Sequence, residues 1–590
     1  MKIYNFLSIL VAVCLVDVSM AQVSPNGKIK AFISDDNTIK VSYKHHGKWL
    51  HVAAMDAKVA SMSQPRYMAV EYEMITGKRH HCVNAYNEST YYANSTKHPN
   101  DQTAKQLTIR VYNDGVALKG NMGTVSFEDA DNNWLQKWTD SYEGFFPKNR
   151  VVKENDRFGY PALFEYVTTR EPVFVLISES DIHSDESGTS MHAVAGKNHF
   201  NLLPDGDTGG WQTFIIGSLA DVVESTLITD NSDATTMTDV SWIEPGVASW
   251  VYWAYNHGSN DYNIIKKYVD LAAILKLKYV LIDAEWDDMK DGKTVADAVK
   301  YAISRGVKPM IWYNSSVGWV NGAPGPKYRL NKPEDREKEF AWCESIGVAG
   351  VKIDFFSGDT NLNMAYMIDL LKCAASHHLL VNFHGATIPR GWQRTYPNLI
   401  STEGVYGAEW YNNVPTFTPI AASHNAILPF TRNVVGPMDY TPCAFSDSQH
   451  PHITTHAHEL ALTALFESGI QHLADKPESF LAQPQEVKDY LTNLPTAWDD
   501  TRLLDGYPGE YAVIARRKGD TWYIAGINGT DKSKNISIDT RLLDCNGKPV
   551  RIFEDSNTTS SPWKITDTTS VPYSICCQPR GGFVIVVNKS

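Results

Sequence analysis

The sequence predicts a multidomain α/β protein in which a central (β/α)8 TIM barrel lies between two β-rich domains. Its 590 residues are too many for one hydrophobic core. Short apolar runs separated by Gly, Asn and Asp turns fill residues 22–245 and return over 505–590. Across 246–504, apolar β runs alternate with amphipathic helical stretches instead. We therefore expect β-sandwich domains at 22–245 and 505–590, and the barrel at 246–504.

The barrel prediction depends on eight candidate strands with helical crossovers between the early ones, spread over a length that suits this fold. The candidate strands are Trp250–Trp253, Tyr279–Asp283, Pro309–Tyr313, Gly350–Phe355, Leu379–Asn382, Leu399–Thr402, Thr431–Gly436 and Ile470–Ala474. The candidate helices are Asn263–Leu275, Val295–Arg305, Pro333–Ile346 and Met364–Ala374. Because no Gly-rich phosphate loop opens these helices, a nucleotide-binding sheet is disfavoured.

Residues 1–21 have the pattern of a secretory signal peptide. Lys2 gives a positive start, Phe6–Val16 is an apolar run, and Ala21 offers a small residue for cleavage. The apolar run is too short to span a membrane, and no later run approaches 18 apolar residues. We therefore expect an exported chain, periplasmic or secreted, without a membrane span.

Composition excludes some classes of partner. The net charge of −13 argues against nucleic-acid binding, which needs a basic surface. The 16 Trp and 29 Tyr suit the stacking of sugar rings, although most aromatic residues in any chain belong to the core. After the signal peptide seven Cys remain without a CxxC pair, so the spacing indicates neither a disulfide scaffold nor a zinc site.

Chemically active side chains follow the predicted barrel strands, at the end where barrel active sites form. They make a ring of carboxylates, aromatics and amides that suits a sugar-cleaving pocket. Its candidate sugar-binding members are Asp283 after strand 2, Trp312 on strand 3, Lys352 on strand 4 and His384 after strand 5.

The pair Lys352 and Asp354 is the sharpest signal, because residues i and i+2 of a strand face the same way. A buried charged pair is costly unless it is functional or fully satisfied. Asp354 is therefore the candidate nucleophile, and a purely structural ion pair is the alternative. A glycosidase needs a second carboxyl group, for which Glu403 and Glu409 are candidates. A cluster of Glu residues can also bind calcium.

Several motifs in this order resemble glycoside hydrolase family 97, exported α-glycosidases known largely from gut Bacteroidetes. The motifs are Ile177–Asp181, Lys352–Phe356, Arg394–Asn398, Glu403 with Glu409, Gly436–Pro442, His458–Ala461 and Phe466–Gly469. The resemblance implies an N-terminal β-super-sandwich, a (β/α)8 barrel and a C-terminal β-sandwich. It also implies Asp354 as nucleophile, Glu409 as acid/base, and Ca²⁺ bound by Glu179, Glu403 and Glu409.

Two positions depart from parts of that family. Its inverting α-glucosidases resemble one another in carrying a Glu directly after the strand-5 His, where this chain has Gly385. The chain is similar instead to the retaining α-galactosidase branch. Gln212 stands where many relatives have an Arg, which leaves the substrate contacts of the N-terminal domain open.

The expected function is that of a retaining exo-α-galactosidase of an exported bacterial type, acting on an oligosaccharide or glycan. The alternatives are an α-glucosidase, another α-glycosidase such as one acting on β-L-arabinopyranosides, or a non-catalytic sugar-binding barrel. We expect a monomer or small homo-oligomer. Glu409 should lie at the shorter carboxyl separation from Asp354 that retention requires, about 5–5.5 Å.

Overall fold

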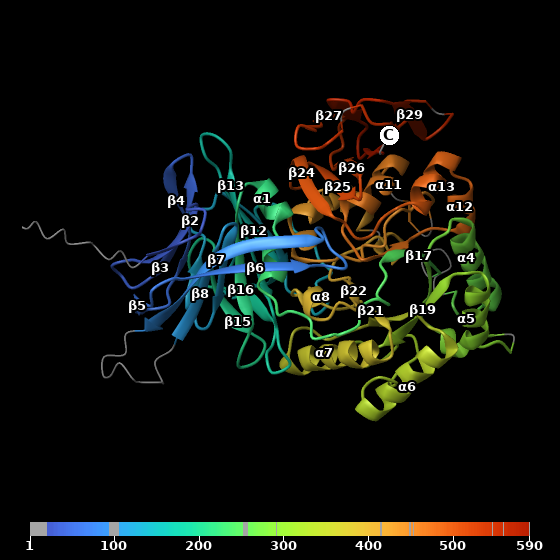
Figure 1. Cartoon of the computed structure of the whole chain (residues 1–590), viewed down its shortest axis with the longest axis horizontal. Coiled ribbons are helices and arrows are strands. Elements are labelled where there is room, and N and C mark those ends of the chain that lie inside the picture. Colours follow the sequence, from blue (N-terminus) through green and yellow to red (C-terminus); the bar gives the residue numbers. More distant parts are fainter. Residues whose placement is uncertain are drawn as a thin grey trace, which may run out of the picture.

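The computed structural model describes residues 21–93, 106–251, 258–290, 292–413, 416–447, 450–451, 453–545, 547–558 and 560–588. Of the predicted signal peptide, all but Ala21 lies outside these residues, as does the end of the predicted strand Trp250–Trp253. The three predicted architectures are confirmed: an antiparallel N-terminal domain, a parallel barrel with helices outside it, and a C-terminal β-sandwich (Figure 1).

The N-terminal domain is one curled sheet of sixteen antiparallel strands. Strands near its edge alternate buried and less buried residues, as in β2, whereas the central strand β13 is buried throughout. Helices α1 and α2 pack near β13 and β16, which explains why β13 reads as a continuous apolar run. The elements are β1 (Ala21–Val23), β2 (Ile29–Ile33), β3 (Ile39–His45), β4 (Lys48–Met55), β5 (Val59–Met62), β6 (Arg66–Glu73), β7 (His81–Ala93), β8 (Gln106–Tyr112), β9 (Gly115–Lys119), β10 (Thr124–Ser126), β11 (Asn132–Lys137), β12 (Arg157–Tyr166), β13 (Val173–Ser180), β14 (Thr189–Ala193), β15 (His199–Pro204), β16 (Trp211–Gly217), α1 (Leu219–Glu224) and α2 (Leu227–Asp230).

The barrel sheet is parallel in the order β22-β21-β20-β19-β18-β17-β23. Its strands are β17 (Gly246–Trp250), β18 (Tyr279–Ile282), β19 (Lys308–Asn314), β20 (Gly350–Asp354), β21 (Leu380–Phe383), β22 (Leu399–Thr402) and β23 (Ile470–Leu473). The crossover helices lie outside it: α4 (Tyr262–Ile274), α5 (Val295–Ser304), α6 (Pro333–Ile346) and α7 (Asn361–Ser376) (Figure 1). The other helical segments are η1 (Trp286–Asp288), α8 (Trp392–Thr395), α9 (Trp410–Asn413), η2 (Thr418–Ile420), α10 (Ala421–Asn425), η3 (Leu428–Phe430), η4 (Arg432–Val435), α11 (His456–Leu465), α12 (Pro477–Leu481) and α13 (Gln485–Thr492).

The predicted strand Thr431–Gly436 is wrong, because this segment contains the 3-10 helix η4. The buried guanidinium of Arg432 donates hydrogen bonds to the carbonyl oxygens of Thr402, Glu403 and Gly404, at and just after the end of β22. A side chain thus satisfies backbone groups that a neighbouring strand would otherwise satisfy. The barrel wall between β22 and β23 is therefore closed by an irregular segment.

The C-terminal domain is a six-stranded antiparallel sheet, in the order β24-β25-β26-β31-β28-β29, with a two-stranded sheet packed on it. It begins at Asp500 rather than at the predicted 505, since Asp500–Leu503 pairs with Ile514–Arg517. Its strands are β24 (Asp500–Tyr507), β25 (Tyr511–Lys518), β26 (Thr521–Asn528), β27 (Lys534–Ser537), β28 (Val550–Asp555), β29 (Trp563–Thr568), β30 (Ser574–Cys577) and β31 (Gly582–Val587).

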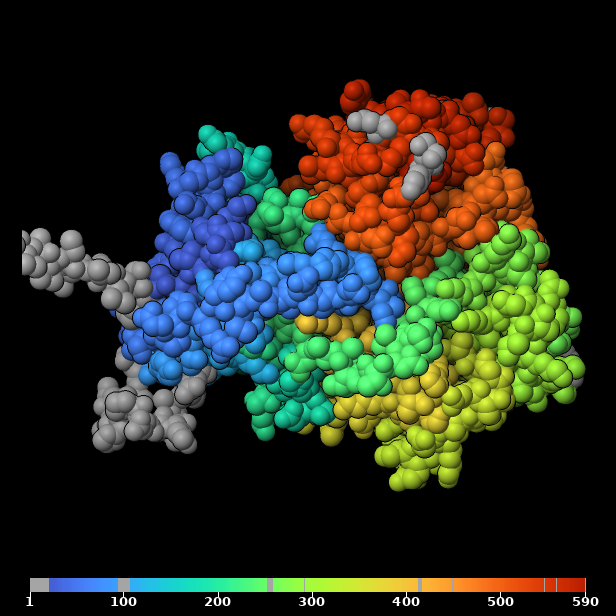
Figure 2. Space-filling model, viewed as in Figure 1, coloured from blue at the N-terminus to red at the C-terminus, as the bar shows by residue number. Residues whose placement is uncertain are grey.

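The turn between β6 and β7 reaches from the N-terminal domain to both other domains (Figure 2). The Nζ of Lys78 donates to the carbonyl oxygens of Val223 and Val434, and the Arg79 guanidinium pairs with Asp500 at 3.2 Å. These contacts fix the N-terminal domain against the barrel and the C-terminal domain. Among the described residues no helix combines the length and apolar character needed to cross a bilayer.

Candidate active site

A pocket of about 510 Å³ opens at the carboxyl ends of the barrel strands. That size suits a small-molecule or sugar site. A segment of the N-terminal domain closes one side of it. Its lining residues are Asp140, Ser141, Glu143, Asp283, Ala284, Trp312, Trp319, Pro324, Lys352, Asp354, Phe355, Phe356, Gly385, Glu403, Glu409 and Trp410. Six of the eight residues predicted for the site therefore line this pocket.

Asp354 ends β20 and presents its carboxyl group to the pocket. Its Oδ2 accepts a hydrogen bond from the Trp312 indole at 3.1 Å, and its Oδ1 accepts one from the backbone N–H of Phe355 at 2.8 Å. Burial raises the pKa of Asp354, although the positive charges of Lys352 and His384 oppose the rise. Two fixed donors thus hold the carboxylate in one orientation, as a nucleophile requires.

Lys352 points inward from the same strand but pairs with Asp283, the residue after β18. Its Nζ lies 3.1 Å from Asp283 Oδ2, and both side chains are almost completely buried. Burial would lower the pKa of Lys352, yet Asp283 and Asp354 outweigh it and raise that pKa. Burial would raise the pKa of Asp283, but Lys352 brings it below its usual value. The pair is therefore charged at the floor of the pocket, where it can bind sugar hydroxyl groups.

Gly385 lies directly against Asp354. A Cβ atom built on this glycine would stand 2.8 Å from Asp354 Oδ1 and 2.6 Å from the Phe355 nitrogen, and its φ is +49°. Both distances are shorter than van der Waals contact allows. A side chain at position 385 and the observed position of Asp354 therefore exclude each other.

His384 does not reach the pocket, contrary to its predicted role in sugar binding. It is 1 % exposed, its Nε2 lies 2.7 Å from Asp439 Oδ2, and its Nδ1 lies 3.3 Å from Glu403 Oε1. Burial would lower its pKa, but these carboxylates raise it well above the usual value. His384 is thus a buried imidazolium that fixes the orientation of Glu403 from behind the pocket wall.

Glu403 and Glu409 lie together at the pocket, and with His384 they form a group whose ligand-type atoms are within 4.8 Å of one another. Glu403 Oε2 also accepts a hydrogen bond from Gly385 N at 2.8 Å. Burial and the charge of Glu403 raise the pKa of Glu409 to about 8. Glu409 is therefore protonated at neutral pH, as a general acid must be before it reacts.

Glu143 is a pocket carboxyl group that the sequence did not single out. It follows β11 in the N-terminal domain, and its Oε1 accepts a hydrogen bond from the Trp410 indole at 2.7 Å. Burial, Glu403 and Glu409 raise its pKa well above the usual value. No periodicity marks it, because it lies in a turn-rich loop whose carboxyl group reaches the barrel only through domain packing.

The structure does not place Glu179 with Glu403 and Glu409. Its Oε1 lies 2.6 Å from Arg390 Nε and its Oε2 accepts from Thr189 N at 2.8 Å, so both oxygens are engaged. Arg390 also pairs with Asp359 at 2.5 Å, and all three side chains are fully buried. Glu179 therefore balances the charge of a buried arginine at the domain interface, a role that sequence spacing did not suggest.

Gln212 lies opposite Glu179 on the paired strand β16 and is buried in the N-terminal domain. It accepts a hydrogen bond from the Tyr160 hydroxyl and donates one to Thr189 Oγ1. It is not part of the pocket lining. The N-terminal domain contributes Asp140, Ser141 and Glu143 to the pocket instead.

Three stretches of the chain match the three regions of one known protein family. Residues 23–233 match the family description "Glycosyl-hydrolase 97 N-terminal", residues 242–405 match "Glycoside hydrolase 97", and residues 497–588 match "Glycosyl-hydrolase 97 C-terminal, oligomerisation". The chain belongs to glycoside hydrolase family 97. It is thus a glycoside hydrolase, and the pocket described above is its candidate active site.

Two curated relatives of this chain carry names that bear on substrate. A "Probable retaining alpha-galactosidase" of Streptomyces bingchenggensis is 36 % identical over 452 residues, covering 71 % of this chain and 67 % of the relative. A "Retaining alpha-galactosidase" of Bacteroides thetaiotaomicron is 30 % identical over 390 residues, covering 60 % of this chain and 55 % of the relative. The match thus spans little more than half of the second relative's length.

Solved structures agree with the fold over nearly the whole chain. A "beta-arabinopyranosidase" superposes with a TM-score of 0.86 at 25 % identity, covering 96 % of this chain and 99 % of that one. A family 97 enzyme from Pseudoalteromonas sp. strain K8, in complex with acarbose, gives a TM-score of 0.80 at 22 % identity with the same coverage. At 22 % identity, the likeness to the Pseudoalteromonas enzyme supports the fold alone.

Proposed function

We propose that this family 97 hydrolase is a retaining exo-α-glycosidase whose substrates are terminal α-galactosides. The observation that carries the proposal is the exclusion between Gly385 and Asp354. The space that a carboxylate-bearing residue after His384 would occupy is filled by the Asp354 carboxyl group, so the pocket has a nucleophile on β20 and no base on β21. The names of both curated relatives support the same reading.

The proposed reaction uses Asp354 and Glu409 in two displacements. Asp354 attacks the anomeric carbon while Glu409 gives its proton to the leaving glycosidic oxygen, which forms a glycosyl ester and releases the aglycone. Glu409, now ionised, takes a proton from water as the water oxygen attacks the same carbon and breaks the ester. Each displacement inverts the centre, so the product keeps the α configuration.

The other pocket residues assist these steps. Lys352 and Asp283 present a charged donor and acceptor at the pocket floor, suited to the hydroxyl groups of one sugar ring. The Trp312 indole holds the nucleophile in place. Trp319 at the rim is 57 % exposed and suits the apolar face of an aglycone.

Substrate and stereochemistry can be tested together. We expect nitrophenol release from aryl α-galactoside to be faster than from aryl α-glucoside. We also expect NMR to show the α-anomer of galactose first, before mutarotation. Appearance of the β-anomer first would contradict retention. Hydrolysis of no glycoside, with sugar binding retained, would favour a non-catalytic barrel.

A β-L-arabinopyranoside is the second candidate substrate, because the superposed β-arabinopyranosidase covers nearly the whole chain. This sugar has the ring configuration of an α-D-galactoside and lacks the hydroxymethyl group at C5. Including its aryl glycoside in the same screen separates the two. Faster turnover of the aryl arabinopyranoside than of the aryl α-galactoside would make the arabinopyranoside the preferred substrate.

We also propose a Ca²⁺ site at Glu403 and Glu409. Calcium prefers carboxylate oxygens, and Glu143 adds a third carboxyl group, whose pKa is raised by burial and by repulsion from the other two. A divalent cation would relieve that repulsion. When bound it would add positive charge near the leaving group. Glu179 does not fit the site, because Arg390 and Thr189 N occupy its oxygens.

Metal removal tests this site. EDTA should lower activity, and Ca²⁺ should restore it. Added Ca²⁺ should also raise the melting temperature, because it binds the folded state. At a Ca²⁺ concentration of 100 times Kd, the free energy of unfolding should rise by about 2.7 kcal/mol. Glu403→Gln should abolish the thermal shift, whereas Glu179→Gln should leave the response to Ca²⁺ in place. No change in either quantity on chelation and re-addition would argue for a simple carboxylate cluster.

The proposed cellular setting follows from the sequence of residues 1–21. We propose export to the periplasm or medium, with the mature chain starting at Gln22. N-terminal sequencing of the protein from its native host would check the cleavage position. The C-terminal family description favours an oligomer over a monomer, which light scattering would measure.

A further inference from the structure

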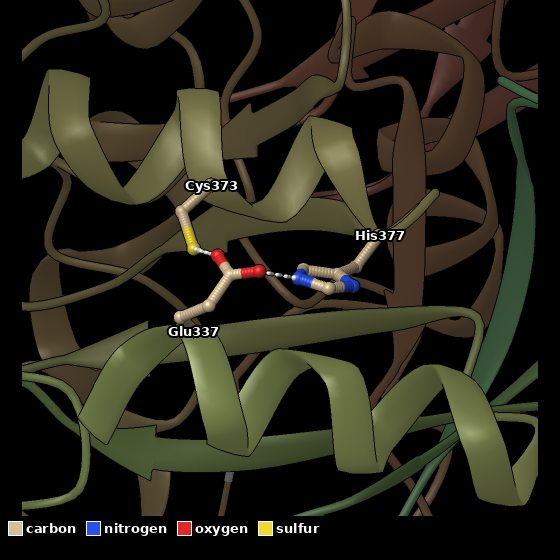
Figure 3. A group of neighbouring side chains, drawn as sticks. All are labelled: Glu337, Cys373 and His377. Carbon is tan, nitrogen blue, oxygen red and sulfur yellow. Dashed lines mark hydrogen bonds and ion pairs between the residues drawn. The ribbon is translucent and has the colours of Figure 1, made fainter. Parts of the chain in front are cut away.

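A second group of metal-ligand side chains lies on the outer face of the barrel, between helices α6 and α7. Glu337 belongs to α6, whereas Cys373 and His377 stand one turn apart on α7 and at its C-terminal end (Figure 3). The three offer a carboxylate oxygen, a thiol sulfur and a ring nitrogen within 4.8 Å of one another. None of them lines the catalytic pocket.

The distances within this group are close to those of a metal-ligand shell. Cys373 Sγ lies 3.4 Å from Glu337 Oε2, and His377 Nε2 lies 3.0 Å from Glu337 Oε1. Zinc bonds of about 2.3 Å to sulfur and about 2.0 Å to nitrogen or oxygen place tetrahedral ligands roughly 3.3–3.5 Å apart. Small side-chain rotations would therefore bring all three atoms to one ion.

Glu344 supplies the outer partner that metal-binding histidines commonly have. Its Oε2 lies 3.0 Å from His377 Nδ1, the ring nitrogen that faces away from Glu337. Its Oε1 is held 3.1 Å from His378 Nδ1. A carboxylate on Nδ1 fixes the ring orientation and leaves Nε2 for a metal. The side chain of His377 is itself almost buried, at 11 % exposure, so the ring has little freedom to turn away.

We propose that Glu337, Cys373 and His377 bind a thiophilic divalent transition metal such as Zn²⁺, which ties α6 to α7. Mixed sulfur, nitrogen and oxygen donors select such ions over Ca²⁺ or Mg²⁺. Glu337 is 61 % exposed, so ions can enter from solvent and water can take the fourth position. The sequence did not reveal this group, because its Cys-x-x-x-His spacing differs from that of a CxxC pair and Glu337 comes from another helix.

Binding has a proton balance that can be measured. In the metal-free protein the Cys373 thiol donates a hydrogen bond to Glu337 Oε2 at 3.4 Å, so the sulfur carries a proton there. Metal binding forms a metal–sulfur bond and releases the thiol proton to solvent. Affinity should therefore rise with pH across the neutral range.

Co²⁺ is the probe that identifies this site, because a Co²⁺–thiolate bond absorbs in the near ultraviolet. Titration of the full chain in saturating Ca²⁺ should give that band with one Co²⁺ per chain, and Zn²⁺ should displace it. Cys373→Ser and His377→Gln should abolish the band and the rise in melting temperature that Zn²⁺ causes. Cys576→Ser, which removes an exposed thiol elsewhere, should change neither.

Glu344→Gln tests the outer partner. It should weaken Zn²⁺ binding by about 10–100-fold while leaving the Co²⁺–thiolate band at saturation. Absence of the band in the unmodified protein would overturn the proposal, and so would a band that persists in Cys373→Ser. Activity of these variants on aryl glycosides should stay near normal, so this result does not depend on the proposed function.

Discussion

Asp354→Ala should lower turnover of aryl α-galactosides by several orders of magnitude. Asp354 is the carboxyl group at the end of β20, held by the Trp312 indole and the Phe355 N–H, and Gly385 leaves no room for a substitute base. Removing a nucleophile removes the covalent route itself. Steady-state kinetics would measure the loss, and the melting temperature would show that the fold is intact.

Azide makes the prediction specific to the nucleophile. Azide entering the vacated space should partly restore turnover and give β-galactosyl azide, since it attacks from the side where Asp354 stood. Asp288→Ala is a suitable control, because this exposed Asp follows strand β18 and does not line the pocket. Near-normal activity of Asp354→Ala would show that the β20 assignment is wrong.

Most of the barrel was predictable, because apolar residues recur with a different period in its strands and in its helices. The prediction for Leu399–Thr402 matches β22 at both ends, and Pro333–Ile346 matches α6. Thr431–Gly436 was not predictable in this way. Its apolar residues are buried like those of a strand, but Arg432 supplies the hydrogen bonds across the gap. A buried arginine that replaces a strand leaves no periodic signal.

The site was predictable where it depends on strand ends and not where it depends on domain packing. Lys352 and Asp354 follow directly from their places on a barrel strand, and Glu403 from its place just after one. The partner of Lys352 was not evident, because Asp283 comes from a different strand end. Glu143 and the Glu179–Arg390 pair unite segments of two domains, and no spacing within one segment encodes such contacts.

The charges around the pocket separate the roles of its carboxyl groups. Lys352 and His384 each carry positive charge and lie near Asp354, which favours its ionised form against burial. His384 also keeps Glu403 ionised. The ionised Glu403 then disfavours a second charge on Glu409. The environment thus favours an ionised Asp354 and a protonated Glu409, the pairing that the proposed mechanism requires.

Glu409→Gln should lower turnover of substrates with poor leaving groups by about 10²–10⁴-fold, because the amide cannot donate a proton. The pKa of Glu409 is raised to about 8, so the acid is protonated below that pH and loses its proton above it. We therefore expect kcat/KM of the metal-free enzyme to fall as the pH rises through about 8. Measurement across pH 5–10 would define this alkaline limb.

The leaving group separates a general acid from a merely structural carboxyl group. Dinitrophenyl α-galactoside needs little protonation, so Glu409→Gln should form its glycosyl ester at a near-normal rate, without the alkaline limb. Glu409→Ala should then accumulate that ester, and azide should release it as α-galactosyl azide, attacking from the face opposite Asp354. Glu143→Gln is the matched control, since it also removes a pocket carboxyl group with a raised pKa. Loss of the alkaline limb in Glu143→Gln but not in Glu409→Gln would transfer the acid role to Glu143.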